Sequence, residues 1–311
     1  MAYSAEVLAD SVTEEGYRLT TLEVTFPRFV LAEFNTHRVF SRNSASSRAI
    51  PTKKRFDSLL DDPVLPVEWG KNQPGMQAPE LVSPENAAKA EKNWLLIRDF
   101  QMLGTLSLVG GIDGIDDAKT KERLQQLIEA YPKVWDLFDP LEGESVHKQI
   151  ANRPLETHQW HTVVVTATEW ENFFALRKHP AAQPEIRHTA ELMSDVIKNS
   201  EPTELGFTEW HLPFVTEEEK KVHSTNLLAK LSVARCARVS YETHDTGKVD
   251  IDKDVKLHNT LRDSGHMSPF EHVARPMSVK ELDISEWSGN FRGWHQYRKD
   301  IPNEDNYAEA N

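Results

Sequence analysis

The chain has 311 residues, enough to bury a large hydrophobic core, and its 36 basic and 49 acidic residues give a net charge of −13. This acidic balance argues against a general nucleic-acid-binding protein, and no apolar run is long enough to span a membrane. The single cysteine, Cys236, excludes an internal disulfide framework and indicates a reducing, cytoplasmic compartment. We expect Cys236 itself to be a small buried core residue.

The first half of the chain predicts two strands, a loop and two helices. β-branched and aromatic residues favour β structure over residues 5–12 and 17–31, with a turn between them. Residues 51–75 are polar and rich in proline and glycine, which predicts a loop. Ser83 and Pro84 open a helix that runs to about residue 106, and a charged helix follows over 116–130.

The second half predicts one more strand and four further helices. The strand covers residues 161–168 and leads into a short helix that carries Asn172 and Arg177. The other three helices are expected over residues 182–198, 216–234 and 252–263. Strands mixed with long helices, without regular alternation, indicate an α+β fold, which we expect to be one domain over residues 1–311.

A polar segment over residues 35–48 points to an anion-binding site. It contains one imidazole, three guanidiniums and a series of hydroxyls, and it has no carboxylate. Guanidiniums match the oxygens of phosphate and the hydroxyls complete the geometry, so the segment predicts a phosphate ligand within an acidic protein. No His-Glu-x-x-His motif and no Cys/His set is present, so no metal site is expected.

Four segments together resemble the flavin-dependent thymidylate synthases (ThyX). Thr36-His37-Arg38, followed by seven residues and Ser46, is similar to their Arg-His-Arg signature. The other three elements are Asn-Phe-Phe-Ala-Leu-Arg at 172–177 with Ala-Gln-Pro-Glu-Ile-Arg at 182–187, Ala-Arg-Val-Ser-Tyr at 237–241, and Gly-His-Met-Ser-Pro-Phe-Glu-His at 265–272. Four separate matches make a chance resemblance improbable.

The order of these elements differs from the order in the family. The last two elements precede the signature in the family but follow residue 230 here, so the chain resembles a circular permutation of the ThyX fold. This order requires that the signature region, 1–55, and the region 230–300 fold together, with 150–200 beside them. Residues 76–140 match no family element and are expected to be a helical insertion. Residues 291–298 weakly resemble the strand that precedes the signature in the family.

The resemblance implies a flavin- and folate-dependent enzyme. Family members methylate C5 of dUMP with carbon from methylenetetrahydrofolate and hydride from FAD, which NADPH reduces, at interfaces of a homotetramer. The implied FAD ligands are His37, Arg38, Ser44, Thr166, Asn172, Ser240, His266 and Ser268. The implied nucleotide ligands, with Arg177 and Ser46 as the catalytic pair, are Glu33, Ser44, Ser46, Ser47, Arg48, Arg153 and Arg177.

Three departures within the signature leave the substrate open. Thr36 replaces the first arginine of the family, Ser44 replaces a glutamate, and Glu33 stands in place of a glutamine. A carboxylate only accepts hydrogen bonds, so Glu33 would favour the 4-amino group of cytosine over the 4-oxo group of uracil. We therefore expect thymidylate synthesis, with hydroxymethylation of dCMP as the alternative. A noncatalytic, flavin-binding paralogue is the third reading.

Overall fold

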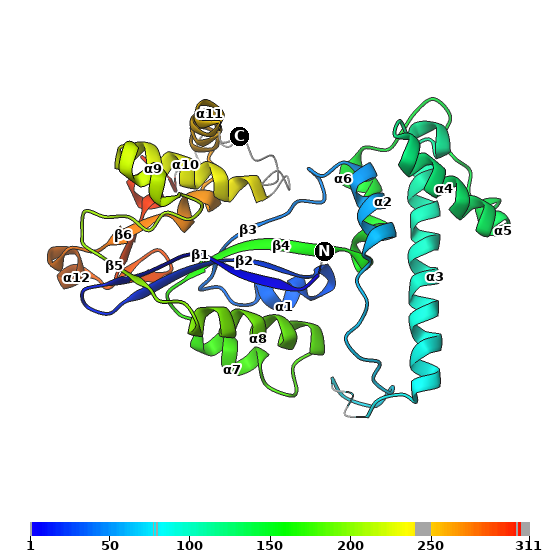
Figure 1. Cartoon of the computed structure of the whole chain (residues 1–311), viewed down its shortest axis with the longest axis horizontal. Coiled ribbons are helices and arrows are strands. Elements are labelled where there is room, and N and C mark those ends of the chain that lie inside the picture. The colour runs from blue at the N-terminus through cyan, green and yellow to red at the C-terminus, as the bar shows by residue number, and fades with distance from the viewer. Residues whose placement is uncertain (1, 77, 79, 240–249, 303, 306–311) are drawn as a thin grey trace.

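Five strands form a twisted sheet at the centre of the molecule (Figure 1). The computed structural model describes residues 2–76, 78, 80–239, 250–302 and 304–305. The sheet order is β3-β4-β2-β1-β5, in which β5 is parallel to β1 and the other neighbours are antiparallel. The strands are β1 (Ser4–Thr13), β2 (Arg18–Pro27), β3 (Ser41–Ser44), β4 (Trp160–Ala167) and β5 (Thr203–Leu205).

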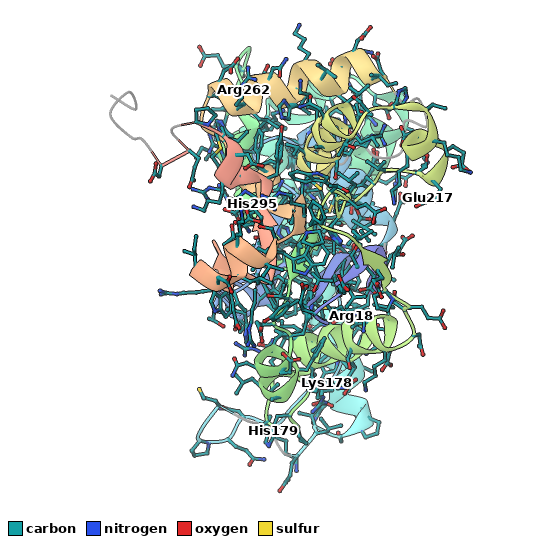
Figure 2. The ribbon with its side chains drawn as sticks, turned by 90° about the vertical axis from the view of Figure 1, so that its left-hand side faces the viewer. Arg18, Lys178, His179, Glu217, Arg262 and His295 are labelled. Atoms are coloured by element: carbon teal, nitrogen blue, oxygen red, sulfur yellow. The ribbon has the colours of Figure 1, made fainter. Side chains whose placement is uncertain are left out.

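One face of the sheet is covered by α7 (Glu171–Arg177) and α8 (Pro184–Lys198) (Figure 1). Apolar residues three and four apart turn one side of α8 into the core, where Ile186, Ala190 and Met193 are fully buried. Arg18 on β2 pairs with Asp10 and donates to the carbonyls that end α8, beside which it lies in Figure 2. These contacts fix α8 against the sheet.

The other face carries the C-terminal part of the chain. It consists of α9 (Glu217–Val222), α10 (Thr225–Arg238), α11 (Ile251–Asp263) and the 3-10 helix η6 (Ser268–His272). Smaller elements follow: β6 (Ala274–Pro276), α12 (Val279–Ile284), β7 (Trp287–Ser288), β8 (Phe291–Arg292), β9 (Trp294–Gln296) and the 3-10 helix η7 (Tyr297–Asp300). The N-terminal hairpin and the C-terminal part of the chain contact each other, because the Trp294 indole donates to the carbonyl of Tyr17 at 3.0 Å.

A set of helices beside the sheet has its own hydrophobic cluster (Figure 1). The set comprises α2 (Thr52–Asp61), α3 (Pro84–Leu108), η2 (Gly111–Gly114), α4 (Ala118–Ala130), α5 (Pro132–Trp135), α6 (Lys148–Ala151) and η3 (Arg153–His158). Phe56, Leu103 and Leu124 are fully buried within it. Over the described residues, no helix combines the length and apolarity that crossing a membrane requires.

Most of the predicted elements are confirmed, including the β1–β2 hairpin, α3, α4, β4, α7, α8 and α11. The second predicted strand was too long, because it ends at Pro27 and residues 28–35 form the 3-10 helix η1 (Arg28–Val30) and α1 (Leu31–Asn35). Val30 and Phe34, four residues apart, pack into the core on one side of this turn.

Two other predictions were wrong in part, and one strand was missed. The loop expected over 51–75 contains α2, which buries Phe56 and Leu59. The helix expected over 216–234 is two helices, because a capping box at Thr216 starts the short α9 and α10 begins separately at Thr225. Cys236 lies on α10 and is fully buried, as expected. The polar segment over residues 35–48 contains a strand, β3, that was not predicted.

Candidate active site

Arg177, at the end of α7, is bound to the first residues of the signature segment. Its Nε donates to Nε2 of His37 at 2.9 Å, and its second terminal nitrogen donates to the Glu33 carbonyl at 3.1 Å and the Thr36 hydroxyl at 2.9 Å. Thr36 in turn donates to the same Glu33 carbonyl at 2.7 Å. Arg177 is therefore held in one orientation by residues that lie 140 positions earlier in the chain.

His37 is buried among aromatic rings and is neutral. Its ring stacks on Phe40 and meets the edge of Phe173, with centroids 5.8 and 4.9 Å away. Burial, together with the charges of Arg177 and Arg42, lowers the pKa of His37 to about 4. A neutral imidazole can accept the Arg177 hydrogen bond, which an imidazolium could not.

A cavity of about 360 Å³ opens beside this cluster. Its lining residues come from the signature segment and from the start of α7: Thr36, His37, Arg38, Val39, Glu169, Glu171, Asn172 and Phe173. Three predicted flavin ligands, His37, Arg38 and Asn172, are thus brought together. The side chains of Arg38 and Asn172 have no hydrogen-bond partner within the described part of the chain, so both are available to a ligand.

The loop of residues 45–50 presents a hydroxyl and a guanidinium to solvent. Asn152 donates to the carbonyls of Ser47 and Ile50 at 2.8 and 3.0 Å, and Lys148 donates to the Ala49 carbonyl. These bonds fix the inner side of the loop. On its outer side Arg48 is exposed, and neither Arg48 nor the Ser46 hydroxyl has a partner among the described residues.

The predicted phosphate ligand Arg153 lies next to this loop but is already paired. Its guanidinium forms an ion pair with Glu156 at 2.8 Å, and Glu156 also pairs with Arg28 at 3.1 Å. Burial alone would raise the pKa of Glu156, but the Ser47 hydroxyl and Arg28 hold that pKa below its usual value. Ser47 therefore contacts a carboxylate, and Arg153 reaches a ligand only by leaving Glu156.

The Arg177 cluster and the 45–50 loop lie at opposite ends of β3. Ser41 pairs with Thr166 and Ser44 with Val163, while the Ala45 amide donates to the Thr162 carbonyl. An extended strand rises about 3.3 Å per residue, so Ser41 and Ser46 are separated by about 16 Å. Among the described residues, no contact joins Arg177 to Ser46, the two predicted catalytic residues, within one chain.

The tail of the chain meets the signature segment through η6, which packs against β3. Thr166 is fully buried, and its hydroxyl contacts Thr21 at 2.7 Å and Nδ1 of His272 at 2.8 Å, so its side chain is occupied inside the fold. His266, before η6, and Ser268, its first residue, are exposed. The fourth predicted ligand of this region, Ser240, lies outside the described residues.

The cations near His37 were not all found from the sequence. Arg298, in the terminal echo, is paired with Glu271 and Glu304 and does not take the place of the missing arginine at Thr36. Arg42 and Arg177 supply the positive charge instead. Asn152, which fixes the 45–50 loop, was also missed, although its place beside Arg153 in the sequence was a usable signal.

Comparison with known proteins identifies the class of this chain. The family model "Thymidylate synthase complementing protein" matches residues 12–203, more than half of the chain, so the protein belongs to this family, the flavin-dependent thymidylate synthases. The match includes the signature segment, α7 and α8.

Among solved structures, the chain is similar to a UMP/dUMP methylase, PolB from Streptomyces cacaoi, bound with 5-Br UMP. The two share 13% sequence identity and a TM-score of 0.41, over 64% of this chain and 89% of that one. No curated protein matches the chain.

Proposed function

We propose that the protein transfers a one-carbon unit to C5 of a pyrimidine deoxynucleoside monophosphate, converting dUMP to dTMP with methylenetetrahydrofolate, FAD and NADPH. The observation that carries this proposal is the Arg177–His37 cluster beside a cavity that contains the free side chains of Arg38 and Asn172. A methyltransferase of the thymidylate synthase family needs a fixed cation next to the base, and Arg177 is held in this way.

Each group in the cluster has a defined part in this reaction. Arg177 would stabilise negative charge on the pyrimidine ring as C5 becomes nucleophilic, and such fixed electrostatics lowers barriers strongly. His37, neutral and buried, orients Arg177 without adding a competing charge. The Ser46 hydroxyl and the Arg48 guanidinium would bind the 5′-phosphate, since both are free and lie on a fixed loop.

The residues around the 360 Å³ cavity fit part of a flavin. Arg38 and Asn172 can donate hydrogen bonds to the oxygens of a ring or a ribose. Glu169 and Glu171 also line the cavity and would repel a pyrophosphate, so this part suits an uncharged portion of FAD. Bound FAD would supply the hydride that reduces the transferred carbon.

The separation of Arg177 from the 45–50 loop supports an active site shared between protomers of a homotetramer. The contacts of Arg177 precede Ser41, whereas Ser46 lies about 16 Å beyond Ser41 along β3, so we infer that one nucleotide does not span both groups of the same chain. A second protomer that brings its own 45–50 loop to the Arg177 cluster would complete the site.

The permuted order of the motifs is part of the same proposal. The family match ends at residue 203, before the two elements that stand first in other members. The packing of η6 against β3 supports the view that these elements occupy their usual place in space, although they come later in the chain. In this view the helices α3 to α5 belong to an insertion, which packs with α2, α6 and η3 in one hydrophobic cluster.

A second candidate function, hydroxymethylation of dCMP, is favoured by one observation. Oε2 of Glu33 is buried and has no hydrogen-bond partner among the described residues, while the Glu33 carbonyl binds Arg177. An unpaired carboxylate oxygen on the residue whose carbonyl binds Arg177 matches an amino group better than a carbonyl oxygen. In that reaction water, and not hydride, would capture the transferred carbon.

One experiment separates these functions. Purified protein is incubated with FAD, NADPH and methylenetetrahydrofolate and with either dUMP or dCMP, and the products are identified by mass. We expect dTMP from dUMP; a hydroxymethyl product from dCMP alone would instead establish the second candidate. The variant Glu33→Gln should raise the preference for dUMP in either case. A protein that forms neither product but stays yellow after unbound FAD is removed would be the noncatalytic, flavin-binding paralogue.

A further inference from the structure

Arg28, on the 3-10 helix η1, is fixed by a buried histidine in the same way as Arg177. Its Nη1 donates to Nδ1 of His161 on β4 at 2.9 Å, since a guanidinium only donates hydrogen bonds. His161 is 1% exposed, and its burial, together with the charges of Arg28 and Arg55, lowers the pKa of His161 to about 3. The neutral ring therefore holds one side of the Arg28 guanidinium in place.

The other side of Arg28 faces the carboxylate of Glu156. The Nη2 atom of Arg28 lies 3.1 Å from Oε1 of Glu156, and Nη1 of Arg153 donates to the same oxygen at 2.8 Å. The Ser47 hydroxyl also forms a hydrogen bond with this carboxylate. Two guanidiniums and a hydroxyl, from three different segments of the chain, thus meet at one carboxylate.

These donors are of the kind that proteins use to bind phosphate. Arginine forks match the oxygens of phosphate, and a phosphate monoester carries about two negative charges and three strong acceptor oxygens. In the cluster of Arg28, Arg153, Ser47 and Glu156, two guanidiniums face one carboxylate, so the cluster keeps a positive charge. A phosphate would therefore balance the two arginines better than Glu156 does.

The cluster is reached from solvent on the side of Arg153. The side chain of Arg153 is 48% exposed and that of Glu156 is 26% exposed, whereas that of Arg28 is only 14% exposed. Ser47 lies in the same loop as Ser46 and Arg48, which the proposed function assigns to the 5′-phosphate. The position of the cluster thus suits an anion that arrives at the 45–50 loop.

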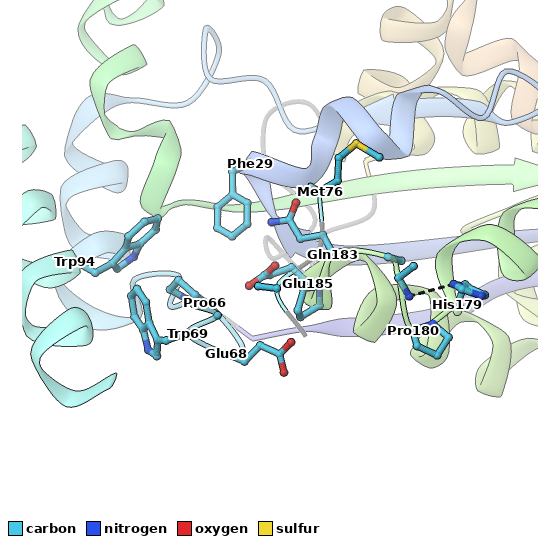
Figure 3. A pocket seen from close by; sticks show the side chains of 15 residues that line it. Phe29, Pro66, Glu68, Trp69, Met76, Trp94, His179, Pro180, Gln183 and Glu185 are labelled. Atoms are coloured by element: carbon cyan, nitrogen blue, oxygen red, sulfur yellow. Dashed lines mark hydrogen bonds between the residues drawn. The ribbon is translucent and has the colours of Figure 1, made fainter. Parts of the chain in front are cut away.

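A cavity near η1 does not offer another place for this anion. Phe29, the neighbour of Arg28, lines a cavity of about 780 Å³ (Figure 3). Among its described lining residues are Glu68 and Glu185 but no lysine or arginine, so this cavity is unsuited to a phosphate. Beside η1, the contacts that favour an anion are those of Arg28.

We propose that Arg28, Arg153 and Ser47 form a binding site for the phosphate of a phosphate monoester, and that the Glu156 carboxylate fills this site in the free protein. Phosphate enters when Glu156 turns to solvent, and it then accepts hydrogen bonds from both guanidiniums and from the hydroxyl. The inference rests on the proposed function where the ligand is the 5′-phosphate of the nucleotide; for inorganic phosphate it stands alone. No sequence motif indicated Arg28 as a binding residue.

A carboxylate that occupies the site should weaken the binding of phosphate. In Glu156→Gln the side chain keeps its size but loses its charge, so phosphate displaces no ion pair and meets no like charge. We expect Glu156→Gln to bind phosphate about tenfold more tightly than wild type does. If Glu156 only held the fold together, its replacement would weaken the binding or leave it unchanged.

The test is calorimetry on the full chain at constant ionic strength, with inorganic phosphate, dUMP and deoxyuridine as separate probes. The matched control is Glu281→Gln, because Glu281 also pairs with an arginine, at 2.7 Å, and its side chain is 30% exposed. We expect this control to bind phosphate as wild type does. Tighter binding of both inorganic phosphate and dUMP by Glu156→Gln identifies the nucleotide as the source of the phosphate, whereas a gain for inorganic phosphate alone identifies a separate anion site. Binding of deoxyuridine should not change.

Two arginine variants guard against a folding defect in Glu156→Gln. Arg153→Met, at a half-exposed position, and Arg28→Met should each weaken phosphate binding about tenfold or more, both in wild type and in Glu156→Gln. The proposal is overturned if neither wild type nor Glu156→Gln binds phosphate or dUMP, if a folded Glu156→Gln binds phosphate no more tightly than Glu281→Gln, or if Arg153→Met binds it as wild type does. Methylation of dUMP tests the proposed function separately: its absence, with tighter phosphate binding in Glu156→Gln, would contradict that function and leave this site intact.

Discussion

Arg177 donates from Nε to Nε2 of His37 at 2.9 Å, joining the end of α7 to the signature segment. A guanidinium only donates hydrogen bonds, so Nε2 of His37 must be the acceptor and the ring proton must lie on Nδ1. The bond therefore fixes both the tautomer of His37 and the direction of the Arg177 side chain.

Replacing Arg177 tests its proposed part in the reaction. Arg177→Lys keeps the charge but loses the fork that contacts His37, Glu33 and Thr36. We expect kcat to fall by about 10²–10³, the loss typical of one fixed electrostatic group. Flavin absorbance should be retained. Steady-state kinetics measure the effect, and Arg262→Lys, at an exposed arginine on α11, is the control; an Arg177→Lys variant with wild-type kcat contradicts this role.

The stability of the protein should depend on the pH through His37. The pKa of His37 is about 4 in the folded protein, and an unperturbed histidine titrates near 6.5, so the unfolded state binds more protons between these values. The stabilisation is complete above pH 6.5 and is lost as the pH falls toward 4.

A variant of His37 separates its contribution to the pH dependence of stability from the contributions of the other buried histidines. His37→Gln can still accept a hydrogen bond from Arg177 but does not titrate. Between pH 7 and pH 5, we expect the wild-type free energy of unfolding to fall by about 2 kcal/mol more than that of the variant. Urea unfolding at both pH values measures the difference. Equal losses in the two proteins would mean that His37 is protonated in the fold.

Asn152 should stabilise the 45–50 loop more than its neighbour Arg153 does. Asn152→Ala leaves the buried carbonyls of Ser47 and Ile50 without their donor. We expect a loss of about 2–4 kcal/mol in stability from two unsatisfied groups, and weaker binding of the nucleotide. Calorimetry with dUMP and thermal unfolding measure these effects. Asn199→Ala, at an exposed position after α8, should change neither quantity.

Restoring the arginine of the family at position 36 should harm this protein. Thr36 accepts a hydrogen bond from Arg177, and Arg42 already adds positive charge beside His37. Thr36→Arg would place a third cation there, and we expect a loss of about 1 kcal/mol and a lower kcat from repulsion of Arg177. Thr36→Val, which removes the hydroxyl without adding charge, is the comparison. A Thr36→Arg variant more active than wild type would contradict the view that Arg42 and Arg177 take the place of the arginine that the family has at position 36.

The sequence predicted the order of most elements because their periodic apolar residues are local signals, as in α8 and the β1–β2 hairpin. It missed β3, since Ser41, Arg42, Asn43 and Ser44 have low strand propensity and form a strand through tertiary contacts, above all the pairing with β4. It also gave Arg177 and Ser46 as one catalytic pair without showing whether one protomer supplies both, because motif spacing carries no information on which protomer supplies each residue.

Mixing two inactive variants tests the shared active site most directly. Arg177→Ala and Arg48→Ala each damage one of the two groups that β3 separates within a chain. If the protein is a homotetramer with active sites between protomers, then exchange of protomers should restore up to about a quarter of the wild-type sites, each combining one intact Arg177 with one intact Arg48. Methylation of dUMP by the mixture, absent from either variant alone, is the predicted result. A mixture that exchanges protomers but stays inactive would contradict the account.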